Sequence, residues 1–231
     1  MTIKYEDVEI LNDKSLVAFK NGNVTPSFDI KLIQPVPDSV RGCLEFKDNN
    51  WYFQVYTSTK NNKVLRGVEI PVNKDDFERE YSDFKKIVIV LESPAKYEYY
   101  GQLPLLPAQG VTGCGIDFYL LDRDFIKKGQ IKLDYYFRYI VLLVNAVQYQ
   151  CSCHVFFKKG LDTNNKNKVF RGLFSQRKAY LRKNFIGRLR NYAADYVVNC
   201  CTSGVKDVVA TAIKEVNKNN ISDIHPSNWY L

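Results

Sequence analysis

The sequence contains no apolar run of about 18 residues, the length needed to cross a bilayer as a helix, so no membrane span is expected. The first residues, from Met1 to Glu6, include no hydrophobic signal region, which predicts an intracellular, cytoplasmic protein. Neither a phosphate-loop lysine motif nor a nucleophile elbow occurs. With 231 residues, no internal repeat and no long low-complexity segment, the chain reads as one large globular domain or two small ones.

The six cysteines do not have the spacing of a metal centre. Cys151 and Cys153 are separated by one residue and Cys200 and Cys201 are adjacent, whereas zinc and iron–sulfur sites use Cys-x-x-Cys pairs. A cytoplasmic location argues against disulfides. We therefore expect buried or free thiols, no metal and no cofactor, with a metal site as the open alternative.

The formal net charge of +8 is concentrated in one part of the chain. Between Lys158 and Arg190 there are eleven lysines and arginines but a single acid, Asp162, which leaves the rest close to neutral. One basic arm on a neutral body favours DNA as a partner, although a solvated helix face beside a loop is the plainer interpretation. The residues expected to bind the DNA backbone are Lys158, Lys159, Lys166, Lys168, Arg171, Arg177, Lys178, Arg182 and Lys183.

The sequence pattern changes near residue 85. Before it, β-type runs at 15–20, 27–33, 41–46 and 51–58 alternate with turn clusters such as Asp48-Asn49-Asn50 and Asn61-Asn62. This pattern predicts a β-rich N-terminal subdomain over residues 1–80, and a short helix or linker is expected at 75–84.

After residue 85, buried β-type runs alternate with amphipathic helical segments. Strands alternating with helices favour a parallel sheet that is covered on both faces. We therefore expect the α/β class, with a three-layer αβα domain and a central parallel sheet over residues 85–231. The expected strands span 87–91, 139–146 and 195–201, and the expected helices span 115–127, 176–191 and 205–217.

Four polar or glycine-bearing segments follow these predicted elements. The first strand runs into Leu91-Glu92-Ser93-Pro94-Ala95, and Pro107–Gly113 contains two glycines before the next helix. The second strand ends near Asn145, and His225-Pro226-Ser227 follows the last predicted helix. Because open parallel sheets bind ligands at the carboxyl ends of their strands, we expect these segments to meet at one edge.

In this order the segments resemble the motifs of the uracil-DNA glycosylase superfamily, most nearly its thermophilic-type branches. Those branches read Gly-Glu-x-Pro-Gly, Pro-Phe-x-Gly-x-x-Gly, a strand-ending asparagine and His-Pro-Ser. The counterparts here are 91–95, 107–113, Asn145 and 225–227, so the resemblance covers about residues 85–228. It implies a glycosylase that hydrolyses the N-glycosidic bond of uracil or a 5-modified pyrimidine in DNA, for repair or for defence against modified viral DNA.

The residue types suit that chemistry. Cleavage of an N-glycosidic bond leaves positive charge on the sugar and negative charge on the departing base. Glu92 would stabilise the sugar cation and orient water, His225 would stabilise the leaving base, and Asn145 would read the base edge. The plainer interpretations are a helix-start carboxylate, an inert histidine in a tail and a turn-capping asparagine.

Small residues make up most of the other expected substrate contacts. Gly110 and Gly113 would bring backbone close to a phosphate at a helix start, unless they are ordinary turn glycines. Ala108 stands where the family places an aromatic that stacks on the flipped base, and Ala95 is small where some relatives have a tyrosine, which would leave room for a modified base. The full set of expected substrate contacts is Ser93, Pro94, Ala95, Ala108, Gly110, Gly113 and Ser227.

Two other functions stay open. The lost aromatic at Ala108 would be the signature of a catalytically inactive nucleic-acid-binding protein on the same fold. A different α/β hydrolase or nucleotide-binding protein is the third candidate, although its motifs are missing. The iron–sulfur cysteines of some relatives are also absent, because no cysteine pair precedes the first motif. A monomer that binds DNA is the expected form.

Overall fold

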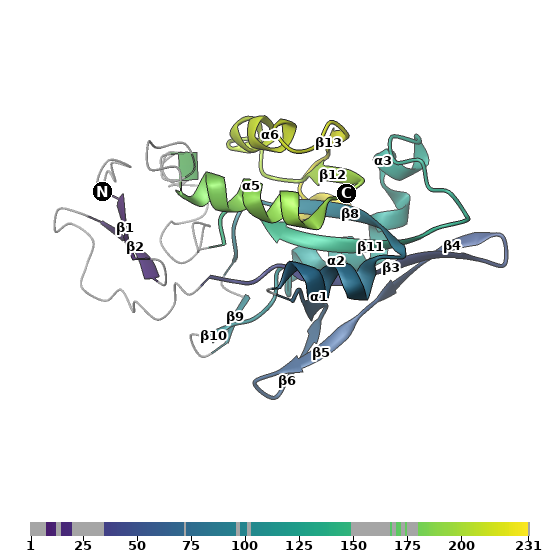
Figure 1. The fold of residues 1–231 in the computed structure, drawn as a ribbon, viewed down its shortest axis with the longest axis horizontal. Helices are drawn as coiled ribbons and strands as arrows, with labels where there is room; N and C mark the ends of the chain where they lie inside the picture. The colour runs from purple at the N-terminus through teal and green to yellow at the C-terminus, as the bar shows by residue number, and fades with distance from the viewer. Residues whose placement is uncertain are drawn as a thin grey trace.

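The computed structural model describes residues 8–12, 15–19, 35–71, 73–95, 98–100, 103–148 and 180–230, with the single positions 167, 170, 171 and 174. A seven-stranded sheet runs through its centre (Figure 1). The strands of this sheet are β3 (Ser39–Lys47), β4 (Asn50–Val55), β7 (Val68–Glu69), β8 (Phe84–Leu91), β11 (Arg138–Asn145), β12 (Tyr196–Asn199) and β13 (Asn220–Ser222).

Helices and separate hairpins complete the described part of the chain. The helices are α1 (Lys74–Tyr81), α2 (Val111–Tyr119), η4 (Leu120–Asp122), α3 (Asp124–Lys127), α5 (Tyr180–Tyr192), α6 (Lys206–Lys214) and η5 (Pro226–Asn228). The hairpins pair β1 (Val8–Asn12) with β2 (Ser15–Phe19), β5 (Thr57–Lys60) with β6 (Lys63–Arg66), and β9 (Tyr99–Tyr100) with β10 (Leu103–Pro104). Among the described residues, no helix has both the length and the apolar character that a bilayer crossing requires.

Parallel strands form the part of the sheet that carries the predicted site residues. β8 pairs with β11 along its whole length and with β12 on its other side, and β12 pairs with β13. The chain order β8, β11, β12, β13 thus becomes the spatial order β11-β8-β12-β13. The chain crosses from one side of β8 to the other between β11 and β12. This makes the carboxyl ends of β8 and β12 a topological switch point, where open α/β sheets bind ligands.

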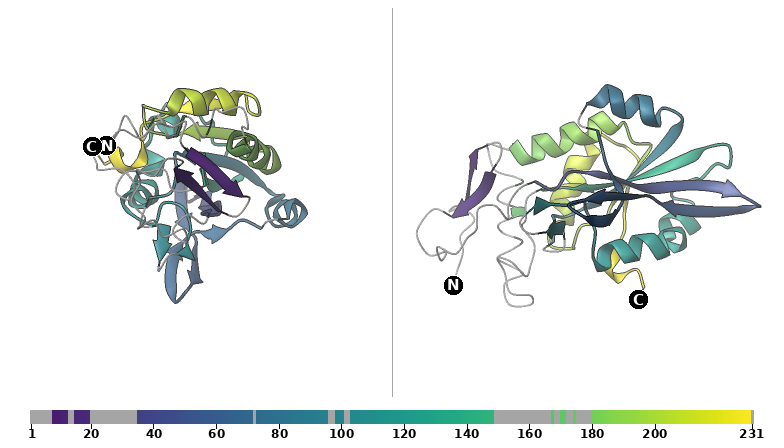
Figure 2. Two further views of the ribbon diagram at one scale, coloured as in Figure 1. Left: turned by 90° about the vertical axis from the view of Figure 1, so that its left-hand side faces the viewer. Right: turned by 90° about the horizontal axis from the view of Figure 1, so that it is seen from below.

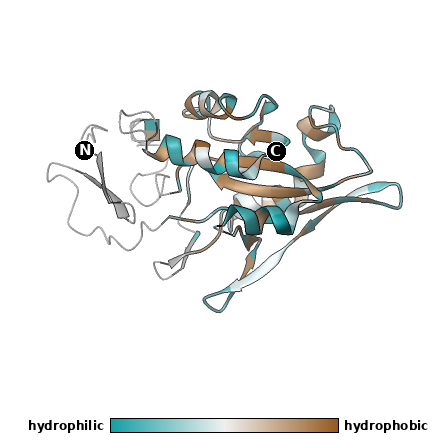
Figure 3. Ribbon diagram, in the orientation of Figure 1, coloured by the Kyte–Doolittle hydropathy of each residue, from teal (hydrophilic) through white to brown (hydrophobic). Residues whose placement is uncertain are grey.

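The sequence of β8 explains its central position. Its residues 87 to 90 are fully buried, and alternate side chains enter opposite hydrophobic clusters. Ile87 and Ile89 lie on one face of the sheet, and Val88 and Val90 lie on the other. A strand buried on both faces has no polar side to offer to solvent, which accounts for its continuous apolar run. Figure 3 shows the central strands as the most hydrophobic part of the ribbon.

Helices cover both faces of this sheet (Figure 2). On one face α1, α5 and α6 contribute Phe77, Phe185 and Ile213 to the core. On the other face α2 and α3 contribute Ile116 and Phe125. The α/β class and a mostly parallel central sheet are therefore confirmed, while the likeness to the glycosylase fold stays a prediction.

Antiparallel strands extend the sheet beyond β11. β3 runs antiparallel to β11 and pairs with both β4 and β7, so part of the predicted β-rich region is continuous with the α/β sheet. Two tight turns in this region need positive φ at both central residues, which asparagine and aspartate tolerate best. The φ angles are 48° and 61° at Asp48 and Asn49, and 52° and 58° at Asn61 and Asn62. The strand expected at 27–33 lies outside the described residues, and a separate unit over residues 1–80 stays a prediction.

Two predicted elements differ from the structure, and one strand of the parallel part of the sheet was not predicted. The helix expected over 115–127 is broken, because α2 ends at Tyr119 and Arg123 is extended before α3 begins. The strand expected over 51–58 is divided at Tyr56, whose backbone bonds Arg41 and Gly67, so that β4 ends at Val55 and β5 begins at Thr57. β13 was not predicted, because it has only three residues and a single buried one.

Candidate active site at the carboxyl edge of the sheet

Polar residues follow neighbouring parallel strands at one edge of the sheet. Glu92 comes directly after β8, Asn145 is the last residue of β11, and Thr202 follows β12. Asn145 lies opposite Leu91 in the parallel register, and the backbone N–H of Val147 donates to the Glu92 carbonyl at 3.1 Å. The structure therefore places Glu92 and Asn145 at the ends of adjacent strands, where the sequence predicted them.

The Glu92 carboxylate lies at the switch point between β8 and β12. Glu92 is 5% exposed, and the Thr202 hydroxyl donates a hydrogen bond to its Oε2. This bond fixes the direction of the carboxylate from the neighbouring strand. Thr202 was missed in the sequence, although it follows a buried strand and Cys200-Cys201 in the way that Glu92 follows β8.

Asn145 presents a side-chain donor that nothing in the described part of the chain satisfies. The residue is 1% exposed, and its Nδ2 is buried without a hydrogen-bond partner among the described residues. The hydroxyl of Ser93, after β8, is also buried without a hydrogen-bond partner among the described residues, and Pro94 beside it is buried. Buried polar groups are nearly always paired, and an unpaired one costs free energy. The Asn145 amide could therefore donate to a ligand that brings a hydrogen-bond acceptor.

His225 and Ser227 are brought together at the start of η5. The ring Nδ1 of His225 accepts from the Ser227 backbone N–H at 3.3 Å and lies 2.8 Å from the Ser227 hydroxyl oxygen. Because Nδ1 acts as an acceptor, a neutral ring carries its proton on Nε2. This tautomer is the one that can donate from Nε2 to an electron-rich atom of a ligand.

Close packing holds the His225 turn against α2. A Cβ atom on Gly115 would clash with the carbonyl of Pro226, so only glycine lets the helix approach this turn. The indole nitrogen of Trp229 donates to the Ile224 carbonyl at 3.1 Å, which closes the turn from the other side. The position of His225 therefore depends on a glycine in α2 that sequence analysis did not select.

We expect Gly115→Ala to push the His225 turn away from α2 and to lower the free energy of unfolding by about 1–3 kcal/mol. Urea denaturation followed by tryptophan fluorescence measures this change. Gly187 in α5 is the matched control, because a Cβ there would meet nothing within 4 Å. Gly187→Ala should stabilise the helix by about 0.5–1 kcal/mol, and equal responses at the two positions would contradict the close packing.

The loop before α2 has a strained residue at Ala108. Its φ is +56°, its methyl group belongs to the hydrophobic cluster on the α2 face, and a Cβ on Gly113 would clash with its carbonyl. The packing of α2 on this loop therefore requires glycine at position 113. Gly110 is the N-cap residue of α2. A contact of either glycine with phosphate stays a prediction. The buried Ala108 methyl group does not replace a stacking aromatic ring.

A buried carboxyl group, Glu98, joins the two loops of the site. It accepts backbone hydrogen bonds from Ala95 at 2.5 Å and from Ala108 at 2.9 Å. Burial raises its pKa to about 7, and the two backbone N–H groups oppose this rise. Sequence analysis missed Glu98, and the only signal was that it is the one acid between Glu92 and Asp117.

The raised pKa of Glu98 predicts a pH-dependent stability. The protonated form is favoured in the folded state, so its stabilising contribution is complete below the ordinary pKa of 4.5 and is lost as pH rises through about 7. We expect the free energy of unfolding of the wild type, relative to Glu98→Gln, to fall by about 3 kcal/mol between those pH values. Urea denaturation at a series of pH values measures the difference, and a constant difference would contradict the raised pKa.

Three of the residues expected to bind DNA are described. Arg171 pairs with Asp207 at 2.5 Å, Arg182 pairs with Glu215, and Lys183 is exposed. Carboxylates in α6 and directly after it therefore neutralise much of the positive charge of these two arginines. The remaining expected residues, Lys158, Lys159, Lys166, Lys168, Arg177 and Lys178, lie outside the described residues.

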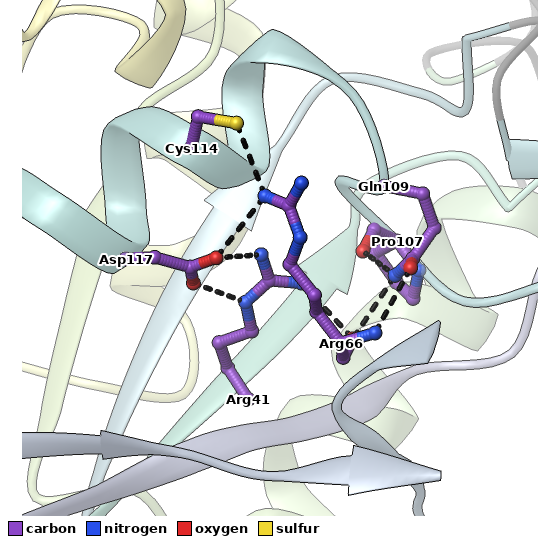
Figure 4. Close-up of polar contacts among 6 residues, drawn as sticks. All are labelled: Arg41, Arg66, Pro107, Gln109, Cys114 and Asp117. Atoms are coloured by element: carbon purple, nitrogen blue, oxygen red, sulfur yellow. Dashed lines mark hydrogen bonds and ion pairs between the residues drawn. The ribbon is translucent and has the colours of Figure 1, made fainter. Parts of the chain in front are cut away.

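A buried charge network anchors α2 to the strands beside it (Figure 4). The Arg41 side chain is fully buried and donates to both carboxylate oxygens of Asp117, at 2.6 and 2.8 Å. Arg66 donates to Asp117 at 3.2 Å and to the Cys114 sulfur at 3.1 Å. Burial lowers the pKa of Arg41, against the effect of its bond to Asp117. This network links β3, β6 and α2 and was not predicted.

Gln109 attaches the loop of the site to the same strands. Its amide donates to the Arg66 carbonyl at 3.0 Å and to the Pro107 carbonyl at 3.1 Å, and its oxygen accepts from the Arg66 backbone N–H at 3.1 Å. Figure 4 shows this side chain facing the edge of β6. The loop between β10 and α2 is therefore held by both Glu98 and Gln109.

The described cysteines are thiols in apolar or basic surroundings. Cys43 and Cys200 are buried, and burial raises the pKa of each thiol. No cluster of three or more histidine, cysteine, aspartate or glutamate residues that could hold a metal occurs in the described ranges. Cys151 and Cys153 lie outside them.

Glu92, Asn145 and His225 each follow or end a parallel strand or the turn after it, and their side chains suit complementary chemical roles. A buried carboxylate can stabilise positive charge, a buried amide can donate to a carbonyl oxygen, and a neutral imidazole can donate to a developing anion. Membership of the uracil-DNA glycosylase superfamily, which the motifs suggest, stays a prediction. Comparison of the chain with protein-family models, with curated proteins and with solved structures finds no match.

Proposed function

We propose that this protein is a DNA glycosylase that hydrolyses the N-glycosidic bond of uracil or a 5-modified pyrimidine in DNA. The observation that carries the proposal is the buried Asn145 amide, which lacks a partner among the described residues and lies beside the end of the strand that leads into Glu92. A base carbonyl would satisfy the amide, and the attached sugar would then lie on the carboxylate side. One ligand of this class accounts for both residues.

The mechanism follows from these positions. The target nucleotide leaves the duplex stack, and Asn145 donates to a carbonyl oxygen of the base. As the bond between C1′ and the base nitrogen breaks, the electron pair moves to the base, and Glu92 stabilises the cationic sugar. Water oriented by Glu92 adds to C1′ and gives up a proton to the Glu92 carboxylate, while His225 donates a hydrogen bond from Nε2 to the anionic base. Thr202 holds the Glu92 carboxylate in place during these steps.

A second candidate has one observation in its favour. Ala108 is buried at the position where the motif resemblance expects an aromatic ring, so the described loop offers no stacking surface there. A catalytically inactive nucleic-acid-binding protein on the same fold would not need that ring. The buried carboxylate and the unsatisfied amide favour the enzyme over this candidate.

Base release tests the proposal. Wild type and Glu92→Gln would be incubated with oligonucleotides containing uracil or 5-substituted cytosines, and alkaline cleavage would report abasic sites. Cleavage by the wild type alone supports the glycosylase. If neither protein cleaves but both bind DNA by fluorescence anisotropy, the binding protein is favoured. If neither cleaves nor binds DNA, and free nucleotides raise the melting temperature, the third candidate is favoured.

A further inference from the structure

We propose that Arg188, braced by Asp38, is a positioning residue that sets the direction of the Asn145 amide. The inference rests on the proposed function, because Asn145 is the residue expected to read the base. Arg188 lies in α5, and its Nη2 donates to the Asn145 carbonyl at 2.8 Å. It therefore acts on the end of β11 from the face of the sheet that carries α5.

Every nitrogen of the Arg188 guanidinium is used. Nε donates to the Asn184 side chain at 2.9 Å, and Nη1 donates to the two Asp38 oxygens at 2.7 and 2.5 Å. A planar group held at three points cannot rotate without breaking bonds. The remaining nitrogen is thereby aimed at the Asn145 carbonyl.

Asp38 joins three parts of the fold at this point. Its side chain is 2% exposed and also accepts from the Tyr192 hydroxyl at 2.7 Å and from the Gln148 amide at 3.3 Å. Asp38 comes directly before β3, Gln148 follows β11, and Tyr192 ends α5. The carboxylate thus fixes the arginine relative to the strand that carries Asn145.

The Asn145 side chain needs such a brace. Its side-chain Nδ2 has no hydrogen bond within the described residues. The position of the side-chain amide therefore depends on the backbone of Asn145, which Arg188 contacts. A pocket of about 240 Å³ lies beside the pair and is lined by Asp38, Arg188, Gln148 and Tyr192 among others. Without Asp38, the guanidinium has room to turn into this space and release the Asn145 carbonyl.

Replacement of the Arg188–Asp38 ion pair makes it possible to test the positioning role separately from the stability of the fold. A buried ion pair generally contributes little net stability, because desolvation offsets the attraction, but loss of one partner leaves an uncompensated charge. Replacing both partners with apolar residues of similar size is therefore compatible with a stable fold. We expect such a variant to retain the fold and to lose the bond to Asn145.

The first test compares base release by Arg188→Met, Arg188→Lys and the pair variant Asp38→Leu with Arg188→Met. We expect kcat to fall about 10- to 100-fold in Arg188→Met and in the pair variant, with KM for DNA within about twofold and partial rescue by lysine. Lys86→Met is the control, since Lys86 is a buried cation at the opposite edge of the sheet that contacts Glu78 and Phe77. Recovery of full kcat in the stable pair variant would overturn the positioning role.

The second test does not depend on base release. In ¹⁵N-labelled protein, the side-chain amide signal of Asn145, assigned with Asn145→Asp, should shift and broaden in the pair variant but not in Lys86→Met. An unchanged signal would overturn the inference whether or not the protein is an enzyme. A wild type that releases no base would refute the proposed function alone, because the amide signal still decides whether Arg188 holds Asn145.

Discussion

Replacing Glu92 with glutamine is expected to lower the rate of base release by about 10²- to 10⁴-fold, the range that a positioned acid–base group contributes. Glutamine has nearly the same shape and can still accept the hydrogen bond from Thr202. It carries no charge to stabilise the sugar cation and cannot accept a proton from water. Single-turnover kinetics with excess protein measures this chemical step directly.

The affinity for DNA should change little in the same variant, because the residues expected to bind the DNA backbone lie elsewhere in the sequence. Anisotropy with a labelled oligonucleotide checks that Glu92→Gln stays within about twofold of the wild type. Glu78→Gln, which changes a carboxylate of α1 in the same way, is the control and should keep full activity. If Glu92→Gln released base at the wild-type rate, the residue would have no part in the chemistry.

Replacing Asp117 with leucine is expected to lower the free energy of unfolding by about 3–5 kcal/mol. Arg41 is fully buried, and Asp117 is its only carboxylate partner among the described residues. The variant leaves the guanidinium buried without an opposite charge, and it also removes a partner of Arg66. Guanidinium chloride denaturation gives the size of the loss.

A second substitution should recover most of this stability. In the combined variant with Arg41→Met the uncompensated charge is gone, so a double-mutant cycle should show strong coupling between the two positions. The exposed pair of Arg79 and Asp76 provides the comparison, because its loss through Arg79→Met should cost less than about 1 kcal/mol. An equally small cost at Asp117 would show that the buried pair does not stabilise the fold.

Local patterns in the sequence were sufficient for the centre of the fold. The apolar runs at β8 and β11 predicted buried strands because a strand covered on both faces must be apolar throughout. Polar residues at the ends of such strands, Glu92 directly after β8 and Asn145 as the last residue of β11, were then placed at the carboxyl edge by the rule for parallel sheets. The runs at 41–46 and 51–58 and the turn cluster between them correspond to β3, β4 and the turn that joins these strands.

Long-range contacts account for what could not be predicted. Arg41 and Asp117 are 76 residues apart, and Arg188 and Asp38 are 150 residues apart, so no local pattern connects them. The extended residue between α2 and α3, Arg123, also has a distant partner, because it bonds Asp223 at 2.9 Å, 100 residues further along the chain. Thr202 was the exception, since its position after a buried strand was visible in the sequence.

The arrangement of β8 between β11 and β12 has a consequence for how the chain folds. Ile87 of β8 pairs with Tyr196 of β12, so the central strand must wait for a partner more than one hundred residues further along the chain. Pairings of such sequence separation make folding slow, because a long loop must close before its contacts form. During synthesis, Glu92 would emerge from the ribosome long before Thr202 and His225. The two sides of the switch point can therefore meet only at a late step of folding, and until then the edge of β8 that pairs with β12 stays unpaired.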